Sequence, residues 1–330
     1  MRKVLFLLIL FLTAAFVTAQ DKSAPQLPKD DAIRIYEFYR VASEIQDALW
    51  PGWSKVPAPL LLVTNDTEFL THHPSPPAAL EKVGDDLYAR PRQFPTAFQA
   101  TFPAFGPPSV IVIGEPANTE SKTSTPWLFT VMHEHFHQMQ NAQPGYMDAV
   151  KALDLSKGDA TGMWMLNYPF PYEKPDVAKA FADLRDSLLS TLAEQDDAKV
   201  KMLAKQYAEQ RHKFFAMLSA DDAKYFNFQL WQEGIARYTE VKSAEAGGHH
   251  TATPEFAALA DYEPFANYAA RARAKTLDEL KQADLAKWQR VVVYSFGAAE
   301  GFLLDRVNPN WRDGYFRKML SLESYFETIR

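Results

Sequence analysis

Residues 133–137 read His-Glu-His-Phe-His, an H-E-x-x-H pattern in a segment that is otherwise rich in apolar residues. Residues four apart on a helix lie on one face, close enough for His133 and His137 to bind one metal ion. Glu134 lies one step around the helix, so its carboxylate can reach a water molecule that the metal holds. Polar ligands on a buried helix need a partner, and a metal ion is the simplest one. The pattern therefore predicts a buried helix that carries a metal site.

The flanking residues predict where this helix begins and ends. Thr125-Pro126 supplies a capping hydroxyl and then a proline at the first helical position, where no N–H donor is needed. Pro144 ends the helix, because proline cannot continue the backbone hydrogen bonds. The β-branched run Ser109–Ile113 predicts a strand just before the helix. His135 points away from the ligand face, so we expect it to pack or to support a ligand.

The amino-terminal residues have the composition of an export signal. Residues 1–19 combine Arg2 and Lys3 with the apolar run Val4–Phe11 and a small-residue end at Val17-Thr18-Ala19. The apolar run is too short for a stable membrane span. We therefore expect a signal peptide that is cleaved after Ala19, with an uncleaved anchor as the alternative.

The chain has no cysteine, which excludes disulfides and leaves histidine and carboxylate as metal ligands. An exported chain without cysteine favours a bacterial periplasm or secretion over a eukaryotic secretory route. Removal of the signal takes away two positive charges and no acid, which changes the formal net charge from −6 to −8. Because the Lys and Arg residues form no basic stripe, we expect no nucleic acid partner, and no membrane span after signal cleavage.

The rest of the pattern predicts an α+β fold that is mostly helical. Residues 20–145 predict an α/β part with a small sheet, which ends in the H-E-x-x-H helix. Its expected elements are a helix from Asp30 or Asp31 to about Leu49, a strand at Leu60–Thr64 and an irregular extended stretch from Gly84 to Pro108. Residues 146–330 predict a helical part, with helices over 176–195, 198–218 and 222–246 and further helices from Thr276 onward.

A catalytic zinc typically takes three protein ligands, so a third ligand is needed. The best candidate is Glu233, which is followed by Gly234 and Ala236, whose small side chains allow another helix to approach closely. Glu240 lies two helical turns further along the same face, where it can accept a hydrogen bond from a ligand imidazole. The alternative is that both are solvated charges on an amphipathic helix.

Two further blocks strengthen the metal hypothesis. Residues 233–240 match the pattern E-G-x-A-x-Y-x-E, and residues 294–298 (Tyr-Ser-Phe-Gly-Ala) match Y-x-x-G-A. With these blocks the chain resembles the gluzincin metallopeptidases, most closely the aminopeptidase N group. The resemblance implies a zincin-like fold, one Zn²⁺ per chain bound by His133, His137 and Glu233, and Glu134 as general base. It also implies that the Tyr294 hydroxyl stabilises the negatively charged oxygen that forms during hydrolysis. The alternative is that Tyr294 is an ordinary buried aromatic residue.

The chain departs from that group in several positions. His137 and Glu233 are 96 positions apart, so an inserted helical pair must fold away and return. The G-x-M-E-N segment that binds a substrate's amino terminus is not found, which leaves endopeptidase and exopeptidase action open. Gln232 stands where the group usually has Asn. No Asp follows Glu233 by four residues, so Glu240 or another residue must support the ligands.

The function that these observations favour is an exported zinc metallopeptidase that acts on peptides or proteins. Peptide bonds would be hydrolysed through a zinc-bound water, with Glu134 as general base. Ser109–Ile113 is expected to be an edge strand that pairs with an extended peptide. Two alternatives are a zinc hydrolase of non-peptide acyl bonds and a catalytically inactive binding protein with a gluzincin fold.

Overall fold

The computed structural model describes residues 24–330. The expected signal peptide, residues 1–19, lies outside this range, so signal cleavage and export stay predictions. Among residues 24–330, no helix combines the length and the apolar character that crossing a bilayer requires.

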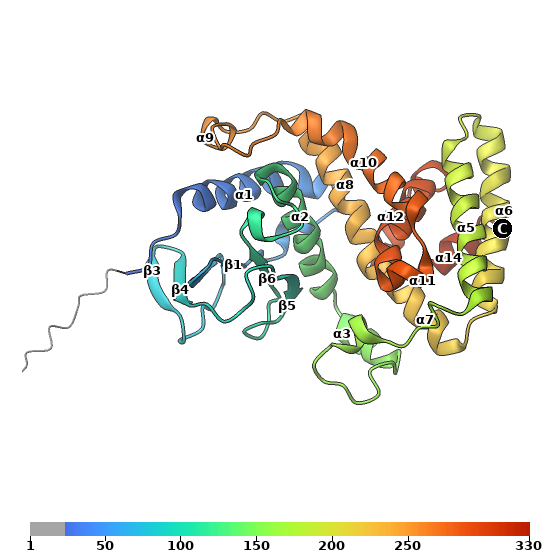
Figure 1. Ribbon diagram of the computed structural model, residues 1–330, viewed down its shortest axis with the longest axis horizontal. Coiled ribbons are helices and arrows are strands. Elements are labelled where there is room, and N and C mark those ends of the chain that lie inside the picture. Colours follow the sequence, from blue (N-terminus) through green and yellow to red (C-terminus); the bar gives the residue numbers. More distant parts are fainter. Residues whose placement is uncertain (1–23) are drawn as a thin grey trace, which may run out of the picture.

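The chain forms one six-stranded sheet and a larger helical part (Figure 1), which confirms an α+β, mostly helical fold. The strands are β1 (Leu60–Val63), β2 (Thr67–Thr71), β3 (Glu81–Gly84), β4 (Leu87–Pro91), β5 (Gln99–Phe102) and β6 (Val110–Gly114). The long helices are α1 (Lys29–Leu49), α2 (Ser124–Asn141), α5 (Pro175–Ala193), α6 (Asp197–Ala216), α7 (Ala220–Gln229), α8 (Ile235–Gly247), α10 (Phe265–Gln282) and α12 (Val292–Val307). Short helices are η1 (Trp53–Lys55), η2 (Pro116–Asn118), α3 (Tyr146–Ala152), α4 (Trp164–Asn167), the π-helical η3 (Leu230–Gly234), α9 (Pro254–Ala257), α11 (Leu285–Trp288), η4 (Gln289–Val291), α13 (Arg312–Tyr315) and α14 (Glu323–Glu327).

The sheet has the strand order β3-β4-β2-β1-β6-β5, and only the pair β1 and β6 is parallel. Side chains alternate between the two faces of a strand. In β1, Leu60 and Leu62 join the large core that runs through the helices, whereas Leu61 and Val63 join a smaller core on the other face. Both faces of β1 are therefore buried, which explains its continuous apolar sequence.

Two expectations for this part of the chain were wrong. The stretch from Gly84 to Pro108, expected to be irregular, contains β4 and β5, and its aromatic residues cover the smaller core. The expected edge strand, residues 109–113, is the interior strand β6, because β5 pairs along its outer side. The edge of the sheet nearest the H-E-x-x-H helix is therefore β5.

The beginning of the H-E-x-x-H helix also differs from the expectation. Helix α2 begins at Ser124 after Thr123, so Pro126 is its third residue and not its first. The Thr125 hydroxyl donates to the carbonyl oxygen of Glu263 at 2.6 Å and caps no N–H group of its own helix. A tertiary contact has replaced the local cap.

The helical part follows the expected pattern with two differences: α10 begins at Phe265, before the expected start at Thr276, and one expected helix is interrupted. Helices α5 and α6 match the first two expected helices, whereas the expected helix over 222–246 is divided into α7, η3 and α8. The π-helical turn η3 contains Glu233. Single π-helical turns inside helices occur frequently at functional sites, because the wider turn changes the direction of its side chains. All described strands precede Glu115, but the division of the chain at residues 145 and 146 stays a prediction, because one core runs through both parts.

Helix α2 lies at the junction of the sheet and the helical part, beside α8 (Figure 1). Helix α12 packs against α8 and η3 from the other side. Gly234 and Gly297 allow this close approach: a Cβ atom on Gly234 would lie 2.6 Å from the Cα atom of Gly297 and 3.0 Å from the carbonyl oxygen of Val293. The glycines of the two sequence blocks thus bring their helices into backbone contact.

This contact predicts that Gly234→Ala destabilises the protein strongly. The added methyl group meets backbone atoms, which cannot move aside as a side chain can, so the two helices must separate. Overpacking of this kind costs about 3 kcal/mol of unfolding free energy. Urea unfolding of wild type and variant measures the loss. A difference below about 0.5 kcal/mol, typical of neutral surface changes, would contradict the packing described here.

Candidate metal centre

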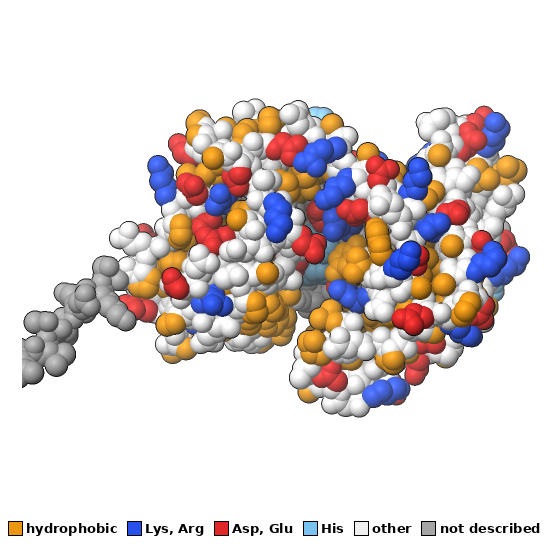
Figure 2. All heavy atoms as spheres, viewed as in Figure 1, with side chains coloured by type: hydrophobic (Ala, Val, Ile, Leu, Met, Phe, Trp, Pro, Cys, Tyr) orange, Lys and Arg blue, Asp and Glu red, His pale blue; other side chains and the backbone are white. Residues whose placement is uncertain are grey.

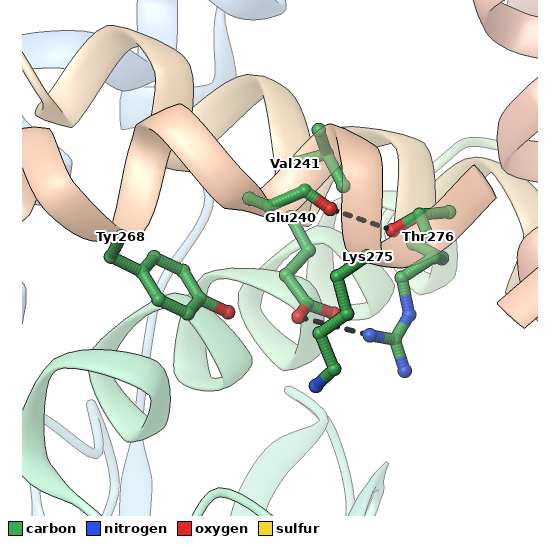
Figure 3. Close-up of a pocket in the computed structure, with 7 residues that line it drawn as sticks. Glu240, Val241, Tyr268, Lys275 and Thr276 are labelled. Carbon is green, nitrogen blue, oxygen red and sulfur yellow. Dashed lines mark hydrogen bonds and ion pairs between the residues drawn. The ribbon is translucent and has the colours of Figure 1, made fainter. Parts of the chain in front are cut away.

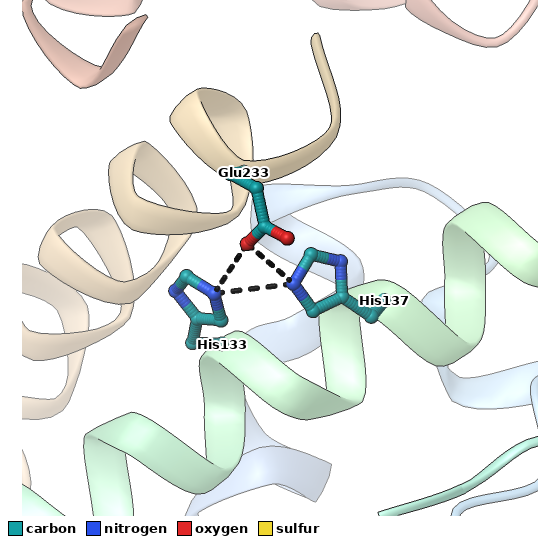
Figure 4. A group of neighbouring side chains, drawn as sticks. All are labelled: His133, His137 and Glu233. Atoms are coloured by element: carbon teal, nitrogen blue, oxygen red, sulfur yellow. Dashed lines mark hydrogen bonds and ion pairs between the residues drawn. The ribbon is translucent and has the colours of Figure 1, made fainter. Parts of the chain in front are cut away.

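Three side chains from two helices converge at the junction of the two parts (Figure 4). Nε2 of His133 and Nε2 of His137 are 3.2 Å apart, and Oε2 of Glu233 lies 3.7 Å and 3.3 Å from them. The three ligand atoms all lie within 4.8 Å of one another, so this group could hold a metal ion. Figure 2 shows the molecule hollowed between its two parts, with histidine atoms visible at the bottom of the hollow.

The imidazoles and the carboxylate are strongly coupled by charge. Burial would lower the pKa of His133, but the carboxylates of Glu233 and Glu240 raise it to about 9. Burial would likewise raise the pKa of the Glu233 carboxyl, yet His137, His133 and Arg290 hold that pKa well below its usual range. Glu233 is therefore a carboxylate, which is the form that binds a metal, whereas the His133 imidazole must release a proton when a metal binds.

His137 is held by Gln140, which lies one turn further along α2. The Nδ1 atom of His137 lies 2.7 Å from Oε1 of Gln140, an atom that only accepts, and 3.1 Å from the amide nitrogen of Gln232. We assign the proton to Nδ1 from the shorter contact, which leaves the lone pair of Nε2 toward the centre. The amide nitrogen of Gln140 donates to the carbonyl oxygens of Trp231 at 3.2 Å and Gln232 at 3.0 Å. One buried side chain thus orients a histidine and ties α2 to the π-helical turn that carries Glu233.

His133 faces Glu240, as the spacing of the sequence predicts. Nδ1 of His133 lies 3.2 Å from Oε2 of Glu240, an ion-pair distance, although the angles fall short of a regular hydrogen bond. Arg237 lies 3.2 Å from Oε1 of the same carboxylate. Behind Glu240 lies a cavity of about 10 Å³, lined also by Tyr268 and Lys275 (Figure 3). This cavity has room for a single water molecule, so the rear of Glu240 is closed to larger ligands.

The Glu134 carboxylate is buried beside the three candidate ligands and accepts a hydrogen bond from a residue of the sheet. The Thr101 hydroxyl lies 2.8 Å from Oε2 of Glu134 and 3.0 Å from its carbonyl oxygen. Thr101 belongs to the edge strand β5, which packs beside α2. A donor from the strand therefore fixes the carboxylate that follows the first ligand histidine.

Tyr294 enters the centre from α12. Its ring stacks on that of His133 with a centroid separation of 6.1 Å, and Arg290 donates to its hydroxyl oxygen at 3.1 Å. Burial and the Glu233 carboxylate raise the pKa of Tyr294. The phenol is therefore neutral and keeps a proton that it can donate.

The structure brings together all five residues that the sequence singles out for this site: His133, Glu134, His137, Glu233 and Tyr294. His135, expected to pack, is buried between Gln46 and Gln138, and burial lowers its pKa to about 4. Sequence reasoning missed Thr101, Gln140 and Arg290. Only Gln140 offered a local signal, because it lies three residues after His137 on the same helix face.

No family model, curated protein or solved structure matches this chain. The resemblance to gluzincins therefore stays an expectation that depends on three short blocks. What the centre can do has to be argued from its own residues and their geometry.

Proposed function

We propose that this protein is a zinc-dependent metallopeptidase that hydrolyses peptide bonds. One observation carries the proposal: His133, His137 and Glu233 converge on one point, and Glu134 lies beside them on the helix of the two histidines. Three protein ligands with a neighbouring buried carboxylate is the ligand set of hydrolytic zinc sites, in which the fourth position takes water or substrate.

The choice of zinc follows from the donor atoms and their spacing. Two imidazoles suit Zn²⁺ far better than Mg²⁺ or Ca²⁺, which prefer oxygen ligands. Ligand atoms at tetrahedral zinc lie about 3.3 Å apart, since each is about 2.0 Å from the metal. The three observed separations, 3.2, 3.3 and 3.7 Å, are close to this value. Gln140 and Glu240 support the two imidazoles from behind, as is usual at zinc sites.

Each residue around the ligands has a distinct part in such a reaction. Bound zinc supplies Lewis acidity, which makes water a better nucleophile at neutral pH and polarises a carbonyl group. The Glu134 carboxylate accepts the proton of the attacking water and passes it to the leaving nitrogen, while Thr101 fixes its orientation. The Tyr294 hydroxyl donates to the carbonyl oxygen as that oxygen gains negative charge.

The edge strand β5 favours a peptide over other acyl substrates. It pairs with β6 on one side and packs beside α2, so its outer backbone groups are available next to the centre. An extended peptide can add to such an edge through main-chain hydrogen bonds. Esters and other non-peptide acyl compounds lack the repeated main-chain N–H and C=O groups that such pairing needs.

The proposal is tested with purified full-length protein and a peptide library. We expect cleavage that a strong chelator abolishes and that added Zn²⁺ restores. Mass spectrometry of the products also shows whether cuts fall inside peptides or at their ends. Zinc-dependent turnover of esters without any peptide cleavage would favour the alternative hydrolase, and zinc binding without turnover would favour a binding protein.

The contact between Glu240 and His133 predicts that Glu240→Gln weakens zinc binding. Loss of the carboxylate removes the partner that orients His133, and outer partners of this kind contribute about tenfold to hundredfold in metal affinity. Competition with a chromophoric chelator measures the dissociation constant. Glu245→Gln, on the same helix but paired with Arg273, is the matched control. Equal zinc affinities for both variants would show that Glu240 does not support the site.

A further inference from the structure

Arg290 enters the centre from η4, immediately before α12. Its Nη2 atom donates to the Tyr294 hydroxyl oxygen at 3.1 Å, and its Nη1 atom donates to Oε1 of Gln229 at 3.2 Å. Nη1 also lies 3.6 Å from Oε1 of Glu233, the carboxylate oxygen that does not face the histidines. The guanidinium is thus enclosed by three partners and only 19% of the side chain is exposed.

The bond from Arg290 decides where the Tyr294 proton can point. A guanidinium has donors and no acceptor, so Tyr294 cannot donate back to Arg290. The phenolic oxygen accepts from a cation, which strengthens the O–H group as a donor. Arg237 lies near the same ring, with its guanidinium carbon 5.8 Å from the centroid. His133 and two arginines fix the ring of Tyr294, and its phenolic proton stays available for donation to another acceptor.

The backbone before Arg290 is unusual. Gln289 has φ of 47° and ψ of −127°, a conformation that is natural for glycine and costs other residues about 1–3 kcal/mol. This turn connects α11 to α12 and directs Arg290 toward the centre. Gln229, which receives the other guanidinium bond, is itself anchored, because its amide donates to the carbonyl oxygen of Met165 at 2.9 Å.

We propose that Arg290 is a positioning residue for peptide hydrolysis, which holds Tyr294 by its oxygen and leaves the phenolic proton for the substrate oxyanion. This inference rests on the proposed function. Arg290 acts through Tyr294, not through the metal ligand Glu233, and it need not touch the substrate.

A double-mutant cycle on the zinc-loaded full chain tests this route. Tyr294→Phe removes an oxyanion donor and should lower kcat by about a hundredfold. Arg290→Gln should lower kcat about tenfold with KM nearly unchanged, and should cost nothing more in the Tyr294→Phe background. Arg290→Lys, which keeps a cationic donor, should recover part of the loss. Equal effects of Arg290→Gln in both backgrounds would overturn the proposal. Arg317→Gln, at an exposed position, is the control.

Two measurements without turnover separate this inference from the proposed function. Arg290→Gln should keep one zinc per chain and should bind a peptide whose scissile amide is replaced by a phosphinate about tenfold more weakly. The phosphinate mimics the charged intermediate, so Tyr294→Phe should abolish the difference. Loss of zinc from Arg290→Gln would overturn the proposal, since the residue would then support Glu233. If wild type cleaves no peptide yet shows this binding pattern, the proposed peptidase function fails, and only the part of the inference in which Arg290 orients the Tyr294 hydroxyl stands. If wild type binds no phosphinate peptide, the inference fails as well.

Discussion

Glu134→Gln is expected to lower peptide hydrolysis by about a thousandfold or more while zinc stays bound. The change replaces the carboxylate by an amide of the same shape, which cannot accept a proton, and general bases contribute about 10²–10⁴ to rates. The three ligand atoms are untouched, and Thr101 can still donate to the amide oxygen of the new side chain. Turnover of a cleaved library peptide measures the loss, and metal analysis of the same sample measures the zinc.

The control for this prediction is Glu120→Gln, the same chemical change at an exposed position. It should behave as wild type. If Glu134→Gln cuts peptides as fast as wild type, Glu134 is not the base. If it loses zinc together with activity, the carboxylate is a ligand or a structural support, and the roles assigned here are wrong.

Glu233→Gln is expected to have the largest effect on metal binding. It removes the only carboxylate among the three ligands, so the loss should exceed the hundredfold that outer partners contribute at most. The remaining pair of imidazoles would hold zinc too weakly to survive dialysis against a mild chelator. Chelator competition gives the dissociation constant, and hydrolysis should fall with zinc occupancy.

The exposed Glu255 offers the matched control for this variant, as Glu255→Gln. Circular dichroism should show that Glu233→Gln is folded, since the change is isosteric. A folded Glu233→Gln protein with wild-type zinc affinity would exclude Glu233 as the third ligand.

The local parts of this site could be predicted from the sequence. The spacing of residues on one helix is enough to predict His133, Glu134 and His137. Glu233 could be predicted because the small residues Gly234 and Ala236 after it mark a close contact between helices. The apolar run of β1 and the length of α5 and α6 are likewise local properties. Such features need no knowledge of which elements become neighbours.

The parts that were missed depend on tertiary pairing. Thr101 comes from an edge strand inside a stretch rich in proline and aromatic residues, where no alternating pattern marks a strand. The turn at Gln289 directs Arg290 toward the centre, and the positive φ of this non-glycine residue has no sequence signal. The π-helical turn at Glu233 depends on packing against α2 and α12 and not on local preference.

We propose that two imidazoles of α2 and one carboxylate of η3 bind one zinc ion. Calorimetric titration of metal-free protein with Zn²⁺ tests this ligand set most directly. Wild type is compared with His137→Ala and Glu233→Gln. We expect one tight site per chain in wild type and none in either variant. Folded wild type without a tight site, or a tight site that persists in both variants, would contradict the claim.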